Sequence, residues 1–418
     1  GNVELKVSIV YDAGNGSMDT VPDSRGVQLE VHYSLVGLPD TKYRSRLADD
    51  RLGHFLTVIK DYSSQIDEEP FVCYVNRWHL QKADMNAKVS PPEEPIIFYI
   101  EKTVPYRFRS YIRQGVLEWN KAFEKIGFVD ALEVRVQKDN ESWDPEDARY
   151  NTIRWIAGAS FAIGPSRVNP LSGQILDADI LINEGFVRSW QRKYTTFFDQ
   201  VQQERDHWIE SSPFKCNMAS GLSHQMNFMA TAMAVRELVG LDGEMPEEYL
   251  GQALKALTMH EVGHTLGLRH NFKASSMLSV EELSDPNIIS KYNITSSVMD
   301  YTPVNFNMET GDVQGDFAMI GIGLYDFWAI EYGYTLGDPN EVLSRSNLPE
   351  HAYLTDEDTG GPDPLAKRYD FSKDPLAYAE NQMRIVNKLR EDLLGQFVEE
   401  GDSWSKARRG YETTLKMQ

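Results

Sequence analysis

One stretch of the sequence has residue types and a spacing suited to metal chemistry: His-Glu-Val-Gly-His-Thr-Leu-Gly-Leu-Arg-His. On a helix, His260 and His264 would share one face, about 6 Å apart along the axis. Gly267 can adopt a positive φ, so the helix stops there and a sharp turn brings His270 to a third position. Three histidines with a fourth position left open are typical of a catalytic zinc site. Glu261 stands where it can take a proton from a water at the metal.

A second motif, Ser-Val-Met-Asp-Tyr, occupies residues 297–301. With the histidine motif, it resembles the metzincin metallopeptidases, whose extended zinc motif is followed by a Met-turn. The resemblance implies that Met299 forms an apolar floor beneath the zinc site. The form S-x-M-x-Y is most similar to the astacin and serralysin branches, which implies that Tyr301 is a loosely held additional ligand. The alternative is a buried methionine and tyrosine in a turn, with neither touching metal.

A third segment, residues 323–333, is similar to the helix that follows the Met-turn in serralysins and matrix metalloproteinases and ends in Tyr-Gly. The whole chain resembles a bacterial family of secreted zinc-dependent metallopeptidases. The residues that carry this resemblance are Asn-Thr-Ile-Arg-Trp at 151–155, the stretch 260–272 and the Met-turn motif. The resemblance implies a fold and a chemistry but does not identify a substrate.

The predicted fold class is α+β, with three regions. Residues 91–340 resemble the metzincin catalytic domain, which implies a twisted mixed sheet, a long crossing helix, an active-site helix and a Met-turn. Within it, residues 187–246 form a helical insertion. Residues 1–90 are β-rich and form either an N-terminal domain or a prosegment-like region, and a proline-rich stretch marks their end. Residues 341–418 form a helical C-terminal extension.

Alternating and β-branched patterns predict strands, and amphipathic patterns predict helices. The predicted strands cover 3–10, 27–36, 53–59, 71–80, 96–100, 132–136, 152–157 and 174–182. The predicted helices include 107–126, one beginning near Pro246 that carries the zinc motif, and 375–398. Residues 159–164 are the candidate for the edge strand that binds substrate backbone in metzincins. An ordinary sheet strand is the alternative there.

Composition restricts the partners and the compartment. The net charge of −21 argues against nucleic acid and anionic membranes, and no apolar run approaches the ~20 residues of a membrane-spanning helix. Two cysteines, Cys73 and Cys216, cannot form a disulfide framework, although one bridge between them is open. The sequence starts without a signal peptide, so a secreted, periplasmic or cell-surface location is implied by the family resemblance alone. The oligomeric state is not predicted.

Two further segments have alternative interpretations. The acidic loop at 354–363 could hold Ca²⁺, but its spacing is not that of an EF-hand, so a solvated loop is preferred. Metzincin prosegments often place a thiolate or carboxylate on the zinc, and residues 1–90 contain Cys73, Asp49 and Asp50. Cys73 lies among apolar strand residues, however, so permanent packing of this region against the catalytic domain is the preferred interpretation.

The resemblance implies a zinc-dependent metalloendopeptidase that cleaves polypeptides with one catalytic Zn²⁺ on His260, His264 and His270. Glu261 would act as general base, and Tyr301 would stabilise the developing oxyanion. Two alternatives are a zinc hydrolase of a non-peptide amide and a non-catalytic binding protein on the same scaffold. The presence of Glu261 argues against the second, because a simple metal scaffold has no need of that carboxylate.

Overall fold

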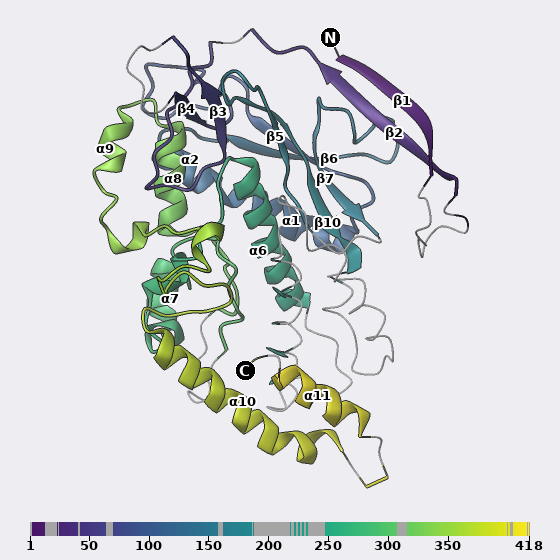
Figure 1. Ribbon diagram of the computed structural model, residues 1–418, viewed down its shortest axis with the longest axis vertical. Coiled ribbons are helices and arrows are strands. Elements are labelled where there is room, and N and C mark those ends of the chain that lie inside the picture. Colours follow the sequence, from purple (N-terminus) through teal and green to yellow (C-terminus); the bar gives the residue numbers. More distant parts are fainter. Residues whose placement is uncertain are drawn as a thin grey trace.

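The fold is that of a computed structural model (Figure 1). The structure describes residues 2–12, 23, 25–40, 42–63, 70–157, 162–185, 187, 218, 221–222, 225, 228–229, 231–232, 247–306, 316–398, 400–401, 404–415 and 417. In Figure 1 the N-terminal strands lie at the top, a sheet and the zinc-motif helix lie in the middle, and the helices Pro375–Phe397 and Ser405–Leu415 lie at the bottom. The architecture is mixed α/β with a β-rich N-terminal region, as the sequence predicts.

The central sheet is built from short apolar strands rich in β-branched residues, which favour the pleated backbone. Strand β5, Ile96–Ile100, pairs in parallel with β6 and β7, and β7 pairs in parallel with β10. At the outer side of β10, Ile163 pairs antiparallel with Leu181, so the sheet is mixed as predicted. The other bounds are β6 Leu132–Val136, β7 Asn151–Ile156 and β10 Ile180–Asn183.

The predicted helix at 107–126 is two helices, α1 (Tyr106–Glu118) and α2 (Asn120–Lys125). At the junction, the amide of Trp119 donates to the carbonyl of Val116, only three residues back, so the regular α-helical pattern is interrupted. The indole of Trp119 donates to the carbonyl of Met259 at 3.0 Å. Helix α1 therefore lies between the sheet and the helix that carries the zinc motif, and it contacts both.

The zinc-motif helix is α6, Glu247–Thr265, and the predicted start near Pro246 falls just outside the described residues. Every residue from 256 to 265 is buried, which places this half of the helix in the interior. Gly267 has a φ of +100°, as the sequence argument requires. The helix therefore ends where the sequence predicts, and the chain turns back on itself.

The strand predicted at 174–182 is divided. Strand β9, Ile175–Ala178, pairs antiparallel with β8, Ser166–Val168, and β10 follows after a single intervening residue. That residue is Asp179, whose carboxylate accepts hydrogen bonds from the amide and the hydroxyl of Thr152. These bonds hold Asp179 out of both ladders, which separates the hairpin from the central sheet.

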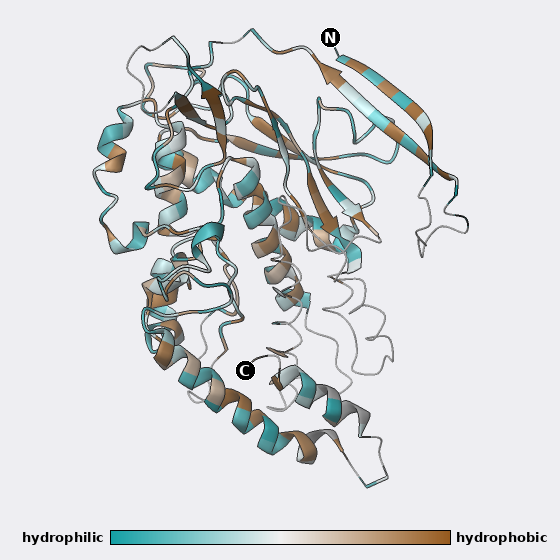
Figure 2. Cartoon of the chain, in the orientation of Figure 1, coloured by the Kyte–Doolittle hydropathy of each residue, from teal (hydrophilic) through white to brown (hydrophobic). Residues whose placement is uncertain are grey.

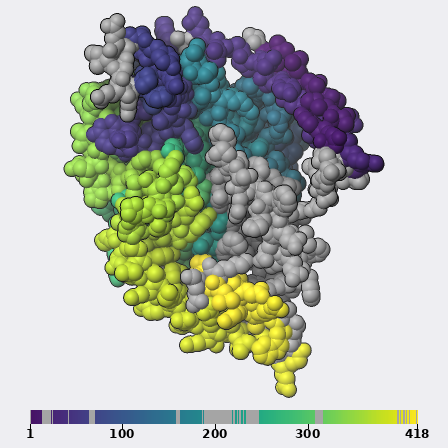
Figure 3. Space-filling view, in the orientation of Figure 1, coloured from purple at the N-terminus to yellow at the C-terminus, as the bar shows by residue number. Residues whose placement is uncertain are grey.

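The N-terminal region contains two antiparallel hairpins. The first joins β1 (Asn2–Tyr11) to β2 (Val27–Val36), and the second joins β3 (Leu56–Lys60) to β4 (Phe71–Val75). Strand β1 alternates hydrophobic and hydrophilic residues along its length (Figure 2). Figure 3 shows the first hairpin along the edge of the molecule, away from the C-terminal helices.

Strands β3 and β4 are shorter than predicted because the residues beside them pair with other segments of the chain. The amide of Phe55 donates to the carbonyl of Gly267 at 2.8 Å, and the amide of Arg269 donates to the carbonyl of Gly53 at 2.9 Å. On the other side, Arg77 pairs with Gln174 before β9. The second hairpin is therefore continuous in backbone hydrogen bonding with the zinc-motif region.

Helices dominate the C-terminal region, as predicted. After the short helix α7, Pro286–Tyr292, they are α8 Leu324–Tyr334, α9 Pro339–Leu343, α10 Pro375–Phe397 and α11 Ser405–Leu415. Of the insertion predicted at 187–246, the few described residues are helical and mostly buried, while Met226, Met233 and Leu238 lie outside the described residues. In the part of the chain that the structure describes, no helix is both long and apolar enough to cross a bilayer.

Candidate metal centre

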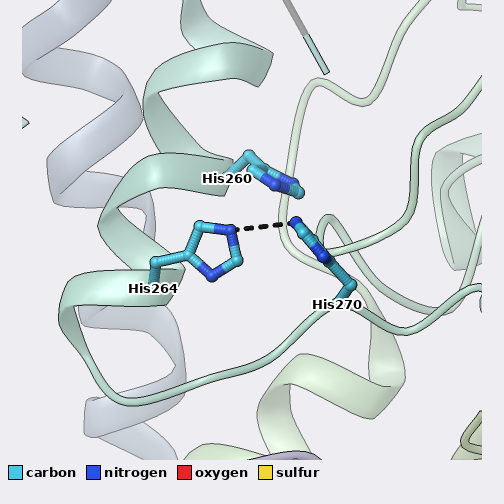
Figure 4. A group of neighbouring side chains, drawn as sticks. All are labelled: His260, His264 and His270. Atoms are coloured by element: carbon cyan, nitrogen blue, oxygen red, sulfur yellow. Dashed lines mark hydrogen bonds between the residues drawn. The ribbon is translucent and has the colours of Figure 1, made fainter. Parts of the chain in front are cut away.

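Three histidines meet where α6 ends. His260 and His264 lie in its last turns, and the turn at Gly267 brings His270 back towards them (Figure 4). One ligand nitrogen from each ring lies within 4.8 Å of the other two. Among the described residues, this is the one group of histidine, cysteine or carboxylate side chains arranged to hold a metal ion. The structure therefore brings the predicted ligands together.

Each of the three rings is oriented by a hydrogen bond at Nδ1. The Nδ1 atom of His260 lies 2.8 Å from the carbonyl oxygen of Val298, and the Nδ1 atom of His264 lies 2.9 Å from the carbonyl oxygen of Leu268. The Nδ1 of His270 faces a carboxylate at 2.8 Å. Because these oxygens only accept, each neutral ring carries its hydrogen on Nδ1 and leaves its Nε2 lone pair for another partner.

The Nε2 atoms of His264 and His270 are 3.2 Å apart, a distance at which two lone pairs repel unless a cation or a proton lies between them. Protonation is disfavoured, since burial, together with repulsion between protonated neighbouring imidazoles (here His264 and His270), lowers the pKa of His264 to about 3. The same causes lower the pKa of His260 well below its usual range. Neutral imidazoles are the ligands that zinc takes in proteins, so these residues fit a zinc ion.

Glu261 is fully buried. It lies beside residues 162–164, the first described residues after position 157. A Cβ built on Gly164 would lie 2.6 Å from the carbonyl oxygen of Glu261 and 3.3 Å from its Oε2. Only glycine permits so close an approach. The Glu261 carboxylate therefore lies between the metal-site helix and residues 162–164, the described part of the predicted edge strand.

Met299 lies beneath the histidines, against α6. A Cβ on Gly263 would approach the sulfur of Met299 to 2.3 Å, and Met299 is fully buried. Glycine between the two helical histidines thus makes room for the thioether. This arrangement agrees with the apolar floor that the sequence resemblance implies.

Tyr301 lies at the cluster as well. Its hydroxyl is 3.0 Å from Nε2 of His270, and its side chain is 2% exposed. Its ring packs against those of His260, His270 and Phe272. The hydroxyl is therefore within reach of an atom held by the histidines.

Asp326, which the sequence argument missed, anchors the Met-turn. Its carboxylate accepts from the hydroxyl of Ser297 at 2.6 Å and from the amides of Val298 and Gly323 at 2.8 and 2.7 Å. Burial raises the pKa of Asp326 to about 7, although these hydrogen bonds oppose the rise. Its position three residues after Gly323, in the first turn of α8, is a capping signal that could have identified it.

Asp356, from the acidic loop, was also missed. Its Oδ2 is the carboxylate oxygen that faces Nδ1 of His270 at 2.8 Å, and its Oδ1 accepts from Arg368 at 2.9 Å. Burial alone would raise the pKa of Asp356, but the hydrogen bond from His270 and the charge of Arg368 outweigh it and lower the pKa to about 2. No local sequence signal marks this aspartate.

The acidic loop does not gather its carboxylates around one point. They are bound instead to cations or amides of the protein: Asp356 to Arg368, Glu357 to Arg269, Asp358 to the amide of Thr355, and Asp363 to Lys273. The structure thus adds no support for calcium at this loop.

The residues considered for latency, Asp49, Asp50 and Cys73, are not part of the ligand group formed by the three histidines. The carboxylate of Asp49 accepts three hydrogen bonds from Arg51, one from its amide and two from its guanidinium, and Asp50 is exposed. Cys73 is a free thiol that pairs with Val58 in the second hairpin. The other cysteine, Cys216, lies outside the described residues.

A three-histidine cluster, with His260 and His264 buried and Met299 beneath them, is the arrangement of a metzincin-type metal site and points to zinc binding. Residues 242–418 match the family described as Met-zincin, and residues 1–83 match a domain of unknown function (DUF5117). No curated protein and no solved structure matches the chain. The C-terminal part of this protein is thus a Met-zincin domain, which confirms the resemblance drawn from the sequence.

The family match and the three-histidine site together suggest a zinc metallopeptidase-like function. The matched segment begins inside the predicted region 91–340 and continues through 341–418. Because a family match does not test where a structural unit begins, the three predicted regions remain a proposal.

Proposed function

We propose that this protein is a zinc-dependent metalloendopeptidase that hydrolyses peptide bonds in polypeptide substrates. The observation that carries the proposal is the convergence of three Nδ1-bonded histidines with a buried glutamate and a tyrosine hydroxyl. The Met-zincin match over residues 242–418 supports it.

His260, His264 and His270 would hold one zinc ion through their Nε2 atoms. When bound, zinc supplies Lewis acidity, which lowers the pKa of water and polarises a carbonyl group. The hydrogen bonds at Nδ1 keep all three rings in the tautomer and orientation that this requires. Met299 closes the site from below and keeps water out on that side.

Glu261 is the general base in this proposal. One of its carboxylate oxygens takes a proton from the attacking water and then delivers it to the nitrogen of the leaving amine. The hydroxyl of Tyr301 donates a hydrogen bond to the oxygen on which negative charge develops. Its position 3.0 Å from Nε2 of His270 supports this role.

The substrate backbone would bind along residues 162–164. Ile163 forms both of its backbone hydrogen bonds with Leu181. Because backbone groups alternate in direction along an antiparallel strand, the N–H and C=O groups of Ala162 and Gly164 point away from β10. An extended peptide can add to such an edge as a further strand. Because Gly164 touches Glu261, a peptide held there would pass beside the proposed base.

The decisive experiment is cleavage of a diverse peptide pool by the zinc-loaded protein, with the cut sites identified by mass spectrometry. Glu261→Ala should abolish cleavage and retain zinc, whereas His264→Ala should lose zinc. Glu248→Ala is the matched control, since this residue lies on the same helix but is exposed. Wild-type turnover by Glu261→Ala would overturn the mechanism.

Tyr301→Phe removes one hydroxyl and no histidine. It should lower kcat by about 10²–10³ while zinc content stays constant. An unchanged kcat would return Tyr301 to a packing role. Cleavage of small N-acyl amides but not peptides would favour the amide hydrolase, and peptide binding without cleavage would favour the binding protein.

The family resemblance also leads us to propose a secreted, periplasmic or cell-surface location. Fractionation of the producing cells tests this directly. Recovery of the protein from the cytoplasmic fraction alone would contradict it.

A further inference from the structure

The third histidine differs from the other two in what holds it. His260 and His264 are bound by backbone carbonyls and belong to one helix, whose interior packing holds them as well. His270 lies beyond the end of that helix, and its Nδ1 faces a side chain from a distant part of the sequence, Asp356. Its orientation therefore depends on a second segment of the chain.

That second segment is fastened to the residues that directly follow His270. The amide of Phe272 donates to the carbonyl of Leu354 at 2.8 Å. The side chain of Asn271 donates to the carbonyl of Ala352 at 2.9 Å and accepts from the amide of Leu354. These contacts hold residues 352–354 against the residues that follow His270, and so fix the position of the chain just before Asp356.

Asp356 is itself held from both ends. Across the short 3₁₀ helix Asp356–Asp358, the amide of Thr355 donates to the carboxylate of Asp358 at 2.8 Å, and the amide of Asp358 donates to the carbonyl of Thr355 at 3.0 Å. The far carboxylate oxygen of Asp356 accepts from Arg368 at 2.9 Å, which leaves the near oxygen directed at His270. The carboxylate is therefore oriented by contacts within the protein.

We propose that Asp356 is the positioning residue for the third zinc ligand. By accepting the hydrogen bond from Nδ1, its carboxylate fixes the His270 ring with Nε2 towards the other two histidines and raises the basicity of that nitrogen. Metal retention is then controlled by a loop more than eighty residues further along the chain. This inference rests on the zinc site of the proposed function but not on its peptidase activity.

The test is zinc affinity, measured by competition with a chromogenic chelator on the full-length protein. Asp356→Ala, which removes the acceptor, should weaken zinc binding by about 10- to 100-fold. Asp356→Asn keeps an oxygen that can accept from Nδ1 but removes the charge, so it should fall between the wild type and the alanine variant. The visible absorption spectrum of the Co²⁺-substituted protein should change for Asp356→Ala, since one ligand loses its fixed orientation.

Two controls separate this role from general packing of the loop. Glu357→Gln removes the neighbouring ion pair with Arg269, and Asp363→Asn removes the pair with Lys273, while both leave the contact with His270 in place. Both should keep zinc affinity within about threefold of the wild type, because neither ion pair contacts a histidine of the cluster. Thermal unfolding of the metal-free proteins checks that all variants fold alike.

The outcomes are distinguishable. Equal zinc affinity for Asp356→Ala and wild type overturns the positioning role, and so does a loss in Glu357→Gln as large as that in Asp356→Ala. Failure of the wild type to bind zinc overturns both this inference and the proposed function. Zinc binding that depends on Asp356, in a protein that cleaves no peptide, supports the inference and refutes only the peptidase.

Discussion

The turn that carries the third histidine, residues 265–270, is held from two sides by different kinds of contact. On the N-terminal side the bonds are to its backbone: Gly53 and Phe55 pair with Arg269 and Gly267, and the indole of Trp78 donates to Thr265. On the C-terminal side they are to its side chains: Asp356 binds His270, and Glu357 binds Arg269.

The difference between the two sides predicts how each responds to substitution. Backbone contacts do not depend on side-chain identity except where a Cβ would obstruct them, so the N-terminal side is sensitive at glycines and to loss of the whole segment. Side-chain contacts can be removed one at a time, and those on the surface contribute little. We therefore expect the N-terminal side to control folding, and on the C-terminal side we expect Asp356 alone to control metal binding.

Removal of residues 1–90 should have the largest effect. This region contributes buried side chains to the main core, namely Leu52, Val75 and Leu80, and it supplies the backbone partners of the turn. The fragment 91–418 should aggregate or unfold at a much lower temperature than the full chain, as judged by solubility and thermal unfolding. This outcome would support our proposal that the region is packed permanently. A soluble fragment with higher activity would instead establish latency.

The substitution Gly267→Ala should have the second largest effect on stability. The φ of +100° at this position is unfavourable for alanine, and a Cβ there would lie 2.0 Å from the backbone oxygen of Asn76. We expect a loss of about 3 kcal/mol or more in the free energy of unfolding, together with lowered zinc content. Gly360→Ala, where a Cβ meets nothing within 4 Å, is the matched control. Similar stability in both variants would contradict the backbone argument.

His54 makes the N-terminal side sensitive to acid. It pairs with Leu268, and burial lowers its pKa to about 4, whereas an unfolded chain has a histidine pKa of about 6.5. As the pH falls through 6.5 the unfolded chain gains a proton that the folded chain does not, so stability is lost until about pH 4. Between about pH 7.5 and about pH 5 the loss from this group is about 2 kcal/mol.

His54→Gln removes this titration, so its unfolding free energy should fall by about 2 kcal/mol less than that of the wild type over the same interval. Denaturant unfolding at the two pH values measures it. The other histidines titrate in both proteins and cancel in the difference. Parallel pH dependence in the two proteins would show that His54 is not the group responsible.

Glu357→Gln should have the smallest effect. Its ion pair with Arg269 is formed at 2.7 Å, but the side chain of Glu357 is 68% exposed. We expect a change of less than about 1 kcal/mol in the free energy of unfolding. A loss comparable to that of Gly267→Ala would show that both sides of the turn control folding and would remove the contrast between them.

The sequence by itself determined the features of the site that depend on residues close together in the chain. The pair His260 and His264, the stop at Gly267 and the return of His270 depend on residues within three helical turns of one another. Helical periodicity and the conformational freedom of glycine are sufficient to specify them. The Met-turn could be recognised as well, because its residue types are contiguous and follow the zinc motif at close range. The strands were predicted where alternation was regular, as in β1, β2 and β6, or where a short apolar run occurred, as in β5.

Only the tertiary structure decided which distant residues complete the site. Asp356 is one of 63 aspartates and glutamates, and it reaches His270 across 86 positions. Nothing in its local sequence distinguishes it from the other acids of its loop. The same holds for Gly53 and Phe55, whose pairing with the turn shortened a strand that the sequence extended to residue 53. Local propensity describes what a segment favours, whereas a contact between segments depends on the path of the whole chain, which only the packed core determines.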